Sequence, residues 1–200
     1  PIRRIAETVR KFAEWKMAGL IAEQELIEGD VVIRDGTLQT SVTNERLYSN
    51  EAMKYVIKKN VILLGLAKTS SLFTSTGFPL FAAISEIAED SDYKKDAWYY
   101  YPIVEINQPD HRAEMYAVKL HSKSEYVFRL EILKDQAKKM KKMEIEKYIG
   151  SLAENAKGSS FPDIHTVLLT QIDLQELVKM KHLLKIYNSF HLRVAQMYLN

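Results

Sequence analysis

The sequence predicts an α/β fold in which helices flank a mixed β-sheet. Over the first 90 residues, segments with apolar residues three or four apart alternate with short apolar runs, the pattern of helices that connect parallel strands. Residues 61–66 are apolar without interruption, which is typical of a strand buried on both faces. Three later segments are rich in aromatic and β-branched residues, which indicates antiparallel strands. Parallel and antiparallel strands together give a mixed sheet.

Each element follows from its spacing. Residues 2–28 predict one long helix, because apolar side chains recur three and four residues apart from Ile5 and Val9 onward while Arg10 and Lys16 lie off that stripe. Gly and Pro are few, and the chain shows no internal repeat or low-complexity linker. The expected order is strand 31–33, helix 44–58, strand 61–66, helix 77–88, strands 98–106, 115–120 and 126–132, a lysine-rich helix 133–157, a loop at 158–162, and a mostly helical segment 167–198.

The composition of the chain limits the kinds of function that it can have. A chain of 200 residues with 46% hydrophobic and 27% charged residues is expected to form a single domain over residues 1–200. The absence of cysteine excludes disulfides and thiolate chemistry, fits a cytoplasmic protein, and leaves only oxygen or imidazole ligands for a metal. No apolar run is long enough to span a membrane. The net charge of +2 requires any nucleic-acid contact to be local. A start at Pro1, without Met, is expected of a chain that lacks its true beginning.

The most informative segment is residues 31–40, where a short apolar run delivers Asp35 into a turn that contains Gly36. An aspartate at the end of a buried strand is held by the sheet and exposed at its rim, which is where a nuclease places a metal ligand. A simple turn is the more common reason for an Asp-Gly pair after a strand. Both interpretations of Asp35 stay open.

Glu14 is the second candidate ligand. It lies one helical turn from Arg10, so it is either a surface charge paired with that arginine, the more common case, or an inward carboxylate that faces Asp35. In the second case Glu14 and Asp35 share a hard divalent cation, Mn²⁺ or Mg²⁺, because these ions prefer oxygen ligands and can bridge to a phosphate.

Basic residues provide candidate phosphate contacts. Lys68 follows strand 61–66 and would reach the same kind of sheet rim as Asp35, although a solvated loop lysine is equally consistent with its neighbours. The glycines of a P-loop are absent before it. The lysines of segment 134–147, with Lys138, Lys141 and Lys142 as the chosen contacts, form either a solvated helix face or a strip that contacts the DNA backbone. Part of the aromatic run 98–101 could stack on bases.

Three segments resemble the NurA nucleases, ribonuclease-H-like enzymes that work with the HerA translocase on DNA ends. The segments are residues 10–14 (RKFAE), 33–38 (IRDGTL) and 64–70 (LGLAKTS). The resemblance implies a ribonuclease-H-like mixed sheet, a manganese- or magnesium-dependent exonuclease or single-strand endonuclease, a hexameric HerA-like ATPase as partner, and a homodimer. It also implies that Glu14 and Asp35 are the second and third acidic ligands. Residues 161–173 resemble the C-terminal motif, which makes Asp173 the fourth active-site position.

One family feature has no counterpart. The first aspartate of the NurA pattern lies in a strand before the first helix, and this chain begins at that helix. Three alternatives follow: a nuclease that lacks its first segment here, a catalytically inactive NurA-like subunit that binds DNA or a ring ATPase, and an unrelated α/β domain whose Asp-Gly pair is only a turn.

Overall fold

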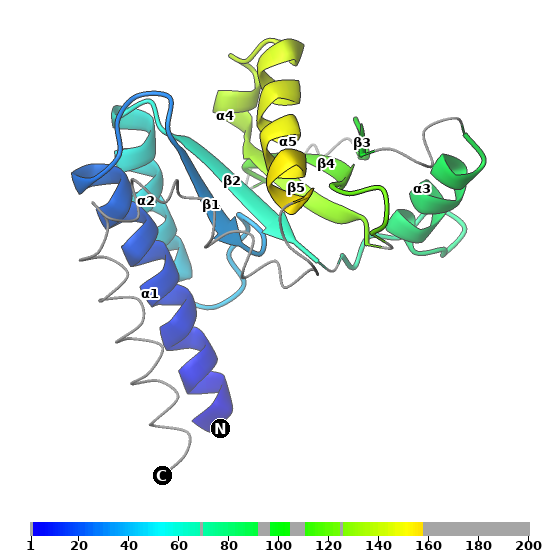
Figure 1. Cartoon of the computed structure of the whole chain (residues 1–200). Helices are drawn as coiled ribbons and strands as arrows, with labels where there is room; N and C mark the ends of the chain where they lie inside the picture. The colour runs from blue at the N-terminus through cyan, green and yellow to red at the C-terminus, as the bar shows by residue number, and fades with distance from the viewer. Residues whose placement is uncertain (1, 69, 92–96, 105–110, 125, 158–200) are drawn as a thin grey trace. The chain divides into compact units, whose positions relative to one another are not determined.

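A mixed sheet of five strands organises the part of the chain that the computed structural model describes, which is residues 2–68, 70–91, 97–104, 111–124 and 126–157 (Figure 1). Its strand order is β1-β2-β5-β4-β3, with β1 and β2 parallel and the other neighbours antiparallel. This confirms the predicted α/β class and the mixed sheet. The strands are β1 (Val31–Asp35), β2 (Ile62–Ala67), β3 (Trp98–Tyr100), β4 (Ala113–Lys119) and β5 (Phe128–Leu133).

The chain divides into two units, Pro1–Lys157 and Gly158–Asn200, and every described residue belongs to the first. The predicted loop at 158–162, the helical segment 167–198 and Asp173 therefore lie outside the described residues. A single domain over residues 1–200 stays a prediction.

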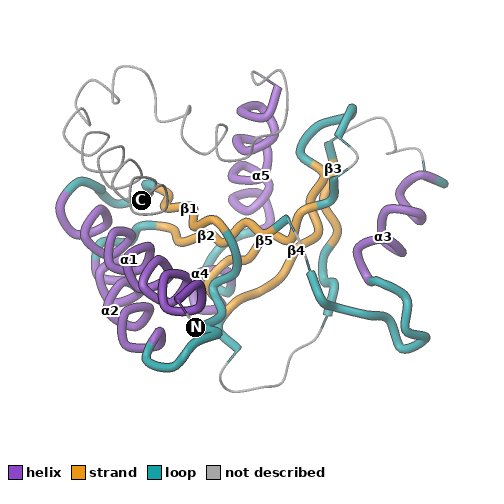
Figure 2. The backbone as a smooth tube through the Cα atoms, turned by 90° about the horizontal axis from the view of Figure 1, so that it is seen from below, coloured by secondary structure: helices purple, strands orange, loops and turns teal. Residues whose placement is uncertain are grey.

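Helices α1 (Ile2–Gln24) and α2 (Glu45–Lys58) cover one face of the sheet, and α5 (Lys142–Lys157) covers the other (Figure 2). The structure also contains the helices α3 (Leu80–Glu89) and α4 (Lys134–Ala137). The first helix ends earlier than predicted, because the Ile27 backbone N–H is bound by the Asp30 carboxylate and Gly29 takes a positive φ of 88°. That turn leads the chain directly into β1. No helix within the described ranges has the length and apolarity that a membrane span requires.

The prediction of one helix over residues 133–157 is wrong. Residue Leu133 completes β5, a single turn forms α4, and a second helix starts at Lys142. The Gln136 side chain fixes the short helix against β2: its Oε1 accepts from the Leu63 N–H at 3.0 Å and its Nε2 donates to the Val61 carbonyl at 2.6 Å. The Glu144 carboxylate then accepts from the Lys141 N–H at 2.8 Å and helps to start α5. The contact between Gln136 and β2 therefore interrupts the predicted helix. The sequence pattern of residues 133–157 does not reveal this contact, because β2 lies far away in the chain.

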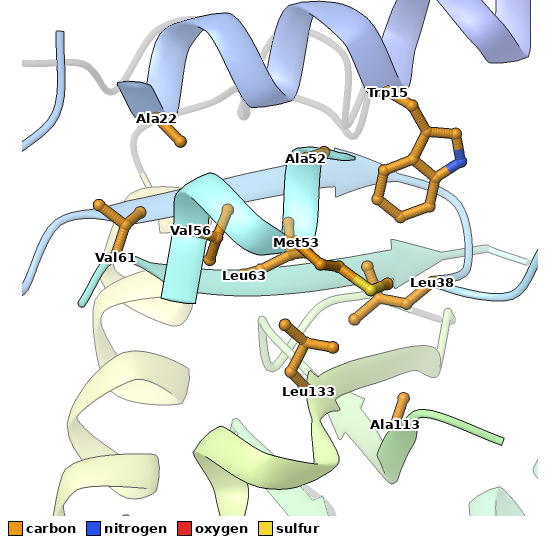
Figure 3. Close-up of a cluster of buried hydrophobic side chains, with 10 residues drawn as sticks. All are labelled: Trp15, Ala22, Leu38, Ala52, Met53, Val56, Val61, Leu63, Ala113 and Leu133. Atoms are coloured by element: carbon orange, nitrogen blue, oxygen red, sulfur yellow. The ribbon is translucent and has the colours of Figure 1, made fainter. Parts of the chain in front are cut away.

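The main core lies between the α1–α2 pair and the sheet (Figure 3). Trp15 and Ala22 point from α1 into this core and meet the α2 side chains Ala52 and Val56. Small residues let the two helices approach closely: a Cβ on Gly19 would lie 3.1 Å from the Ala52 Cα. This packing holds the start of β1 and the whole of α2 in fixed positions relative to the sheet.

Candidate functional site

Asp35 and Lys68 lie at the same edge of the sheet. In the parallel pair, Asp35 is opposite Leu66, so both strands end at one edge and Lys68 follows just beyond it. Both side chains are exposed. Gly36 adopts a φ of 103°, which favours glycine, and its N–H donates to the Leu66 carbonyl at 2.8 Å. The adjacency of these two strands is confirmed, and it places a carboxylate and an ammonium at the same exposed end of the strand pair.

A glycine on β2 supports this edge. The backbone after β1 crosses directly over Gly65, where an added Cβ would come 2.8 Å from the Gly36 carbonyl oxygen and 3.2 Å from the Leu38 nitrogen. Leu38 is buried in the core. The chain that follows Asp35 is therefore packed closely against β2.

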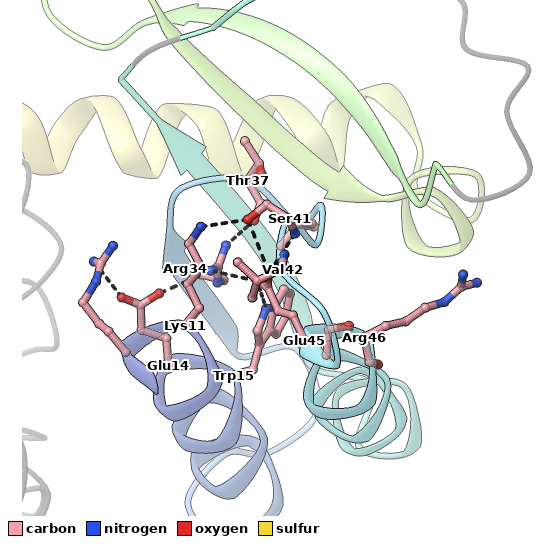
Figure 4. Close-up of polar contacts among 12 residues, drawn as sticks. Lys11, Glu14, Trp15, Arg34, Thr37, Ser41, Val42, Glu45 and Arg46 are labelled. Carbon is pink, nitrogen blue, oxygen red and sulfur yellow. Dashed lines mark hydrogen bonds and ion pairs between the residues drawn. The ribbon is translucent and has the colours of Figure 1, made fainter. Parts of the chain in front are cut away.

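Glu14 is engaged by two arginines. Its Oε1 lies 2.9 Å from Arg10 Nη1, and its Oε2 lies 3.2 Å from Arg34 Nη2 (Figure 4). Arg34 faces the helices from β1, and because strand side chains alternate, Asp35 leaves the strand on the other face. The structure thus pairs Glu14 with arginine, and a cation shared with Asp35 stays a prediction that requires Glu14 to exchange an arginine for a metal.

Sequence reasoning missed the centre of this network, which is Arg34. Its guanidinium lies 4.6 Å from the centroid of the Trp15 ring, 3.7 Å from Glu45 Oε1, and also donates to the Thr37 carbonyl (Figure 4). The Arg34 side chain is only 8% exposed and that of Glu45 1%. The sequence does contain a signal for this network, because Arg34 directly follows three apolar residues of the strand. An arginine that is buried in such a strand is almost always paired with an acidic side chain.

Glu45 is charged in this buried place. Burial alone would raise its pKa, but hydrogen bonds from the Ser41 N–H at 2.7 Å, Trp15 Nε1 at 2.9 Å and the Val42 N–H at 3.2 Å, together with Arg34, lower the pKa below its ordinary value. Burial lowers the pKa of Arg34, against the opposing effect of Glu14 and Glu45. Arginine is so basic that it keeps its proton, so the network is ionic.

A second missed pair lies on β5. Glu131 is fully buried opposite Gly65, and its Oε2 accepts from the Leu38 N–H at 2.5 Å. Arg129, two residues earlier on the same strand face, donates to its other oxygen. The strand sequence FRLEIL could have indicated this pair, because Arg129 and Glu131 have opposite charges and lie two residues apart on one face of the strand. Together with Gly65 it fixes the path of the chain after Asp35.

The predicted DNA contacts lie away from the Asp35 edge. Gln136 binds the backbone at the amino end of β2, so the turn between α4 and α5, which carries Lys138 and Lys141, lies at that end. Asp35 and Lys68 lie at the carboxyl end of the same strand. The structure therefore does not bring these lysines together with the candidate metal ligand, and their contact with DNA stays a prediction.

Tyrosines of the aromatic run 98–101 contact side chains of β4 and α5. Tyr101 stacks on Tyr116 with ring centroids 4.4 Å apart, and its hydroxyl lies 3.3 Å from Glu114 Oε2. Burial and a 2.8 Å hydrogen bond to Glu146 raise the pKa of Tyr99 to about 12. Tyr100 points outward and is half exposed. It is the member of the run on β3 with the most surface open to a base.

Within the described residues, no group of three or more His, Asp or Glu side chains is arranged to hold a metal ion. Asp173 lies outside those residues. Comparisons of the chain with protein-family models, with curated proteins and with solved structures found no match. The resemblance to NurA nucleases therefore rests on the sequence segments around Glu14, Asp35 and Lys68 and on residues 161–173.

Proposed function

We propose that the chain is a NurA-like, divalent-metal-dependent DNA nuclease with a ribonuclease-H-like fold and a reaction centre at the carboxyl edge of β1 and β2. The observation that supports this best is the exposure of Asp35 and Lys68 at one edge of a parallel strand pair. Ligands of α/β sheets bind outside the carboxyl ends of the strands. A carboxylate can bind a cation and an ammonium can contact a phosphate, and metal-dependent phosphodiester hydrolysis uses both kinds of group.

The donors at this edge suit Mn²⁺ or Mg²⁺, which prefer oxygen ligands. Asp35 is an exposed carboxylate at the end of β1. Glu14 would become the second ligand only on releasing Arg10 or Arg34 and on a rearrangement that brings it to the face on which Asp35 leaves the strand. A bound cation of this kind polarises the scissile phosphate and lowers the pKa of a coordinated water. Lys68 would contact the same phosphate and offset the charge that develops on its oxygens.

The resemblance to NurA nucleases also suggests the biological setting. The chain would process DNA ends, as an exonuclease or single-strand endonuclease, together with a HerA-like hexameric ATPase and as a homodimer. Asp173 would be a further active-site position.

The alternative is a catalytically inactive NurA-like subunit that binds DNA or a ring ATPase. One observation favours it: both carboxylate oxygens of Glu14 are held by arginines, so Glu14 can bind a metal ion only after it releases one of them. Such a subunit would bind DNA without cutting it.

A cleavage assay separates the two proposals. End-labelled single-stranded and duplex DNA would be incubated with the protein in Mn²⁺, in Mg²⁺ and in EDTA. We expect cleavage in Mn²⁺ or Mg²⁺ only, its loss in Asp35→Asn, and full activity in the control Asp90→Asn, which removes an exposed carboxylate after α3. DNA binding without cleavage under every metal condition would overturn the nuclease proposal in favour of the inactive subunit.

A further inference from the structure

Six exposed lysines lie at the amino end of β2, and they come from two segments that are far apart in sequence. Two of them end α2, immediately before β2, and four belong to the turn and helix start after α4. Gln136 joins the segments, because its side-chain amide binds the backbone of Val61 and Leu63. We call this surface the basic edge; its lysines are Lys58, Lys59, Lys138, Lys139, Lys141 and Lys142.

Few ion pairs neutralise the lysines of the basic edge. Lys142 lies 3.7 Å from Glu146, but across the described ranges none of the other five lysines has an ion pair with a carboxylate. The nearby Glu144 already accepts a hydrogen bond from the Lys141 backbone. A chain with a net charge of only +2 thus concentrates unpaired positive charge on one edge.

Helix stability accounts for this placement of lysines only in part. A lysine in the last turn of α2 is favourable to the helix dipole, which explains Lys58. Lys142 occupies the first position of α5, where a positive charge is unfavourable by about 0.3–1 kcal/mol. Lys138 is the C-cap of α4, where a positive charge is again favourable, so helix stability explains part of the basic edge but not the charge of Lys142 at the start of α5.

We infer that the basic edge binds the phosphate backbone of nucleic acid as a surface separate from the Asp35 edge. We choose nucleic acid as the polyanion because of the proposed function. The clustering of the lysines is an observation that does not depend on that function. The strand β2 of six residues separates the two edges by roughly 20 Å at about 3.3 Å per residue. DNA that contacts both edges therefore extends about six base pairs beyond the phosphate at Lys68, at about 3.4 Å per base pair along one strand.

Binding measured without cleavage tests this inference. Fluorescence anisotropy of a labelled duplex of about 20 base pairs would be followed in EDTA over a range of salt concentrations. Two variants each remove one part of the basic edge, Lys58→Gln/Lys59→Gln and Lys138→Gln/Lys141→Gln. The control, Lys16→Gln/Lys54→Gln, removes the same charge from the outer surface of α1 and α2.

We expect each basic-edge pair to weaken binding about fivefold or more at low salt and to reduce the slope of log affinity against log salt by up to about 1.8, at about 0.9 per phosphate contact. The control should stay close to the wild type. Equal affinity of all four proteins, or binding of anionic phosphatidylserine vesicles in place of DNA, would overturn the inference. Salt-sensitive binding without any cleavage in Mn²⁺ would contradict the nuclease proposal and leave the basic edge standing.

Discussion

Arg34 lies between two carboxylates, with its Nη2 at 3.2 Å from Glu14 Oε2 and 3.7 Å from Glu45 Oε1. A guanidinium in this position does electrostatically what a metal ion would do, since it neutralises acidic side chains that converge from α1 and α2 onto β1. The metal chemistry proposed for Glu14 therefore competes with an ion pair that is already formed.

The competition can be measured at Arg10, the exposed partner of Glu14. Arg10→Gln frees Glu14 Oε1 and leaves Arg34 in place. If Glu14 binds metal, Mn²⁺ affinity should rise up to about fivefold, because an exposed ion pair is worth up to about 1 kcal/mol. Mn²⁺ titration followed by electron paramagnetic resonance gives the affinity. The gain should vanish when Glu14→Gln is added, and a gain that survives in the double variant would assign it to general electrostatics.

Glu45 should make stability depend on pH. Its pKa is lowered on folding from an ordinary value of 4.5, so its contribution is fully present above that value and is lost as the pH falls through the lower, folded-state pKa. Glu45→Gln should cost about 1–3 kcal/mol at pH 7, because it weakens buried charged hydrogen bonds. The cost should shrink at pH 3. Urea unfolding at the two pH values tests this, and an equal cost at both would show that the charge of Glu45 does not contribute.

Gly65 should tolerate no side chain. Gly65→Ala places a Cβ 2.8 Å from the Gly36 carbonyl oxygen, so we expect a loss of about 1–3 kcal/mol in the free energy of unfolding. Gly150→Ala is the matched control: it lies within α5, where an added Cβ meets nothing within 4 Å, and it should gain up to about 1 kcal/mol. Thermal unfolding followed by circular dichroism compares them. A neutral Gly65→Ala would mean that residues 36–38 do not hold their position over β2.

Lys68 should affect turnover more than binding. As a group that stabilises charge on the reacting phosphate, its loss in Lys68→Met should lower the single-turnover rate on the order of 10²-fold with little change in DNA affinity. Lys54→Met, on the exposed surface of α2, should change neither. A loss of affinity with an unchanged rate at saturating protein would make Lys68 a binding contact only.

Much of the fold could be predicted because the spacing of apolar residues and the order of helices and strands can be seen within short stretches of the sequence. The helix between β1 and β2 predicts their parallel pairing, and that pairing brings Asp35 and Lys68 to one edge. The buried face of α1 was less accessible to sequence reasoning. Ile5 and Val9 lie on the predicted apolar stripe but are exposed, because α2 packs against the side with Trp15 and the small residues beyond it.

The charged parts of the site depend on tertiary contacts that spacing does not contain. Arg34 meets Glu14 and Glu45 from elements 20 and 11 residues away in the chain. The position of the lysines depends on β5, which is antiparallel to β2 and so carries the chain back to the amino end of that strand before Lys138. A pattern of lysines on a helix gives no information about which edge of the sheet it will reach.

Binding of Mn²⁺ itself tests the metal site at Asp35 most directly, measured by electron paramagnetic resonance on the wild type and on Asp35→Asn without DNA. We expect a site in the wild type whose Mn²⁺ affinity falls at least tenfold in Asp35→Asn, with unchanged circular dichroism because the side chain is exposed at the end of β1. Asp90→Asn should bind like the wild type. Equal Mn²⁺ affinity in the wild type and Asp35→Asn, or no binding by either, would contradict the assignment of this edge as the metal site.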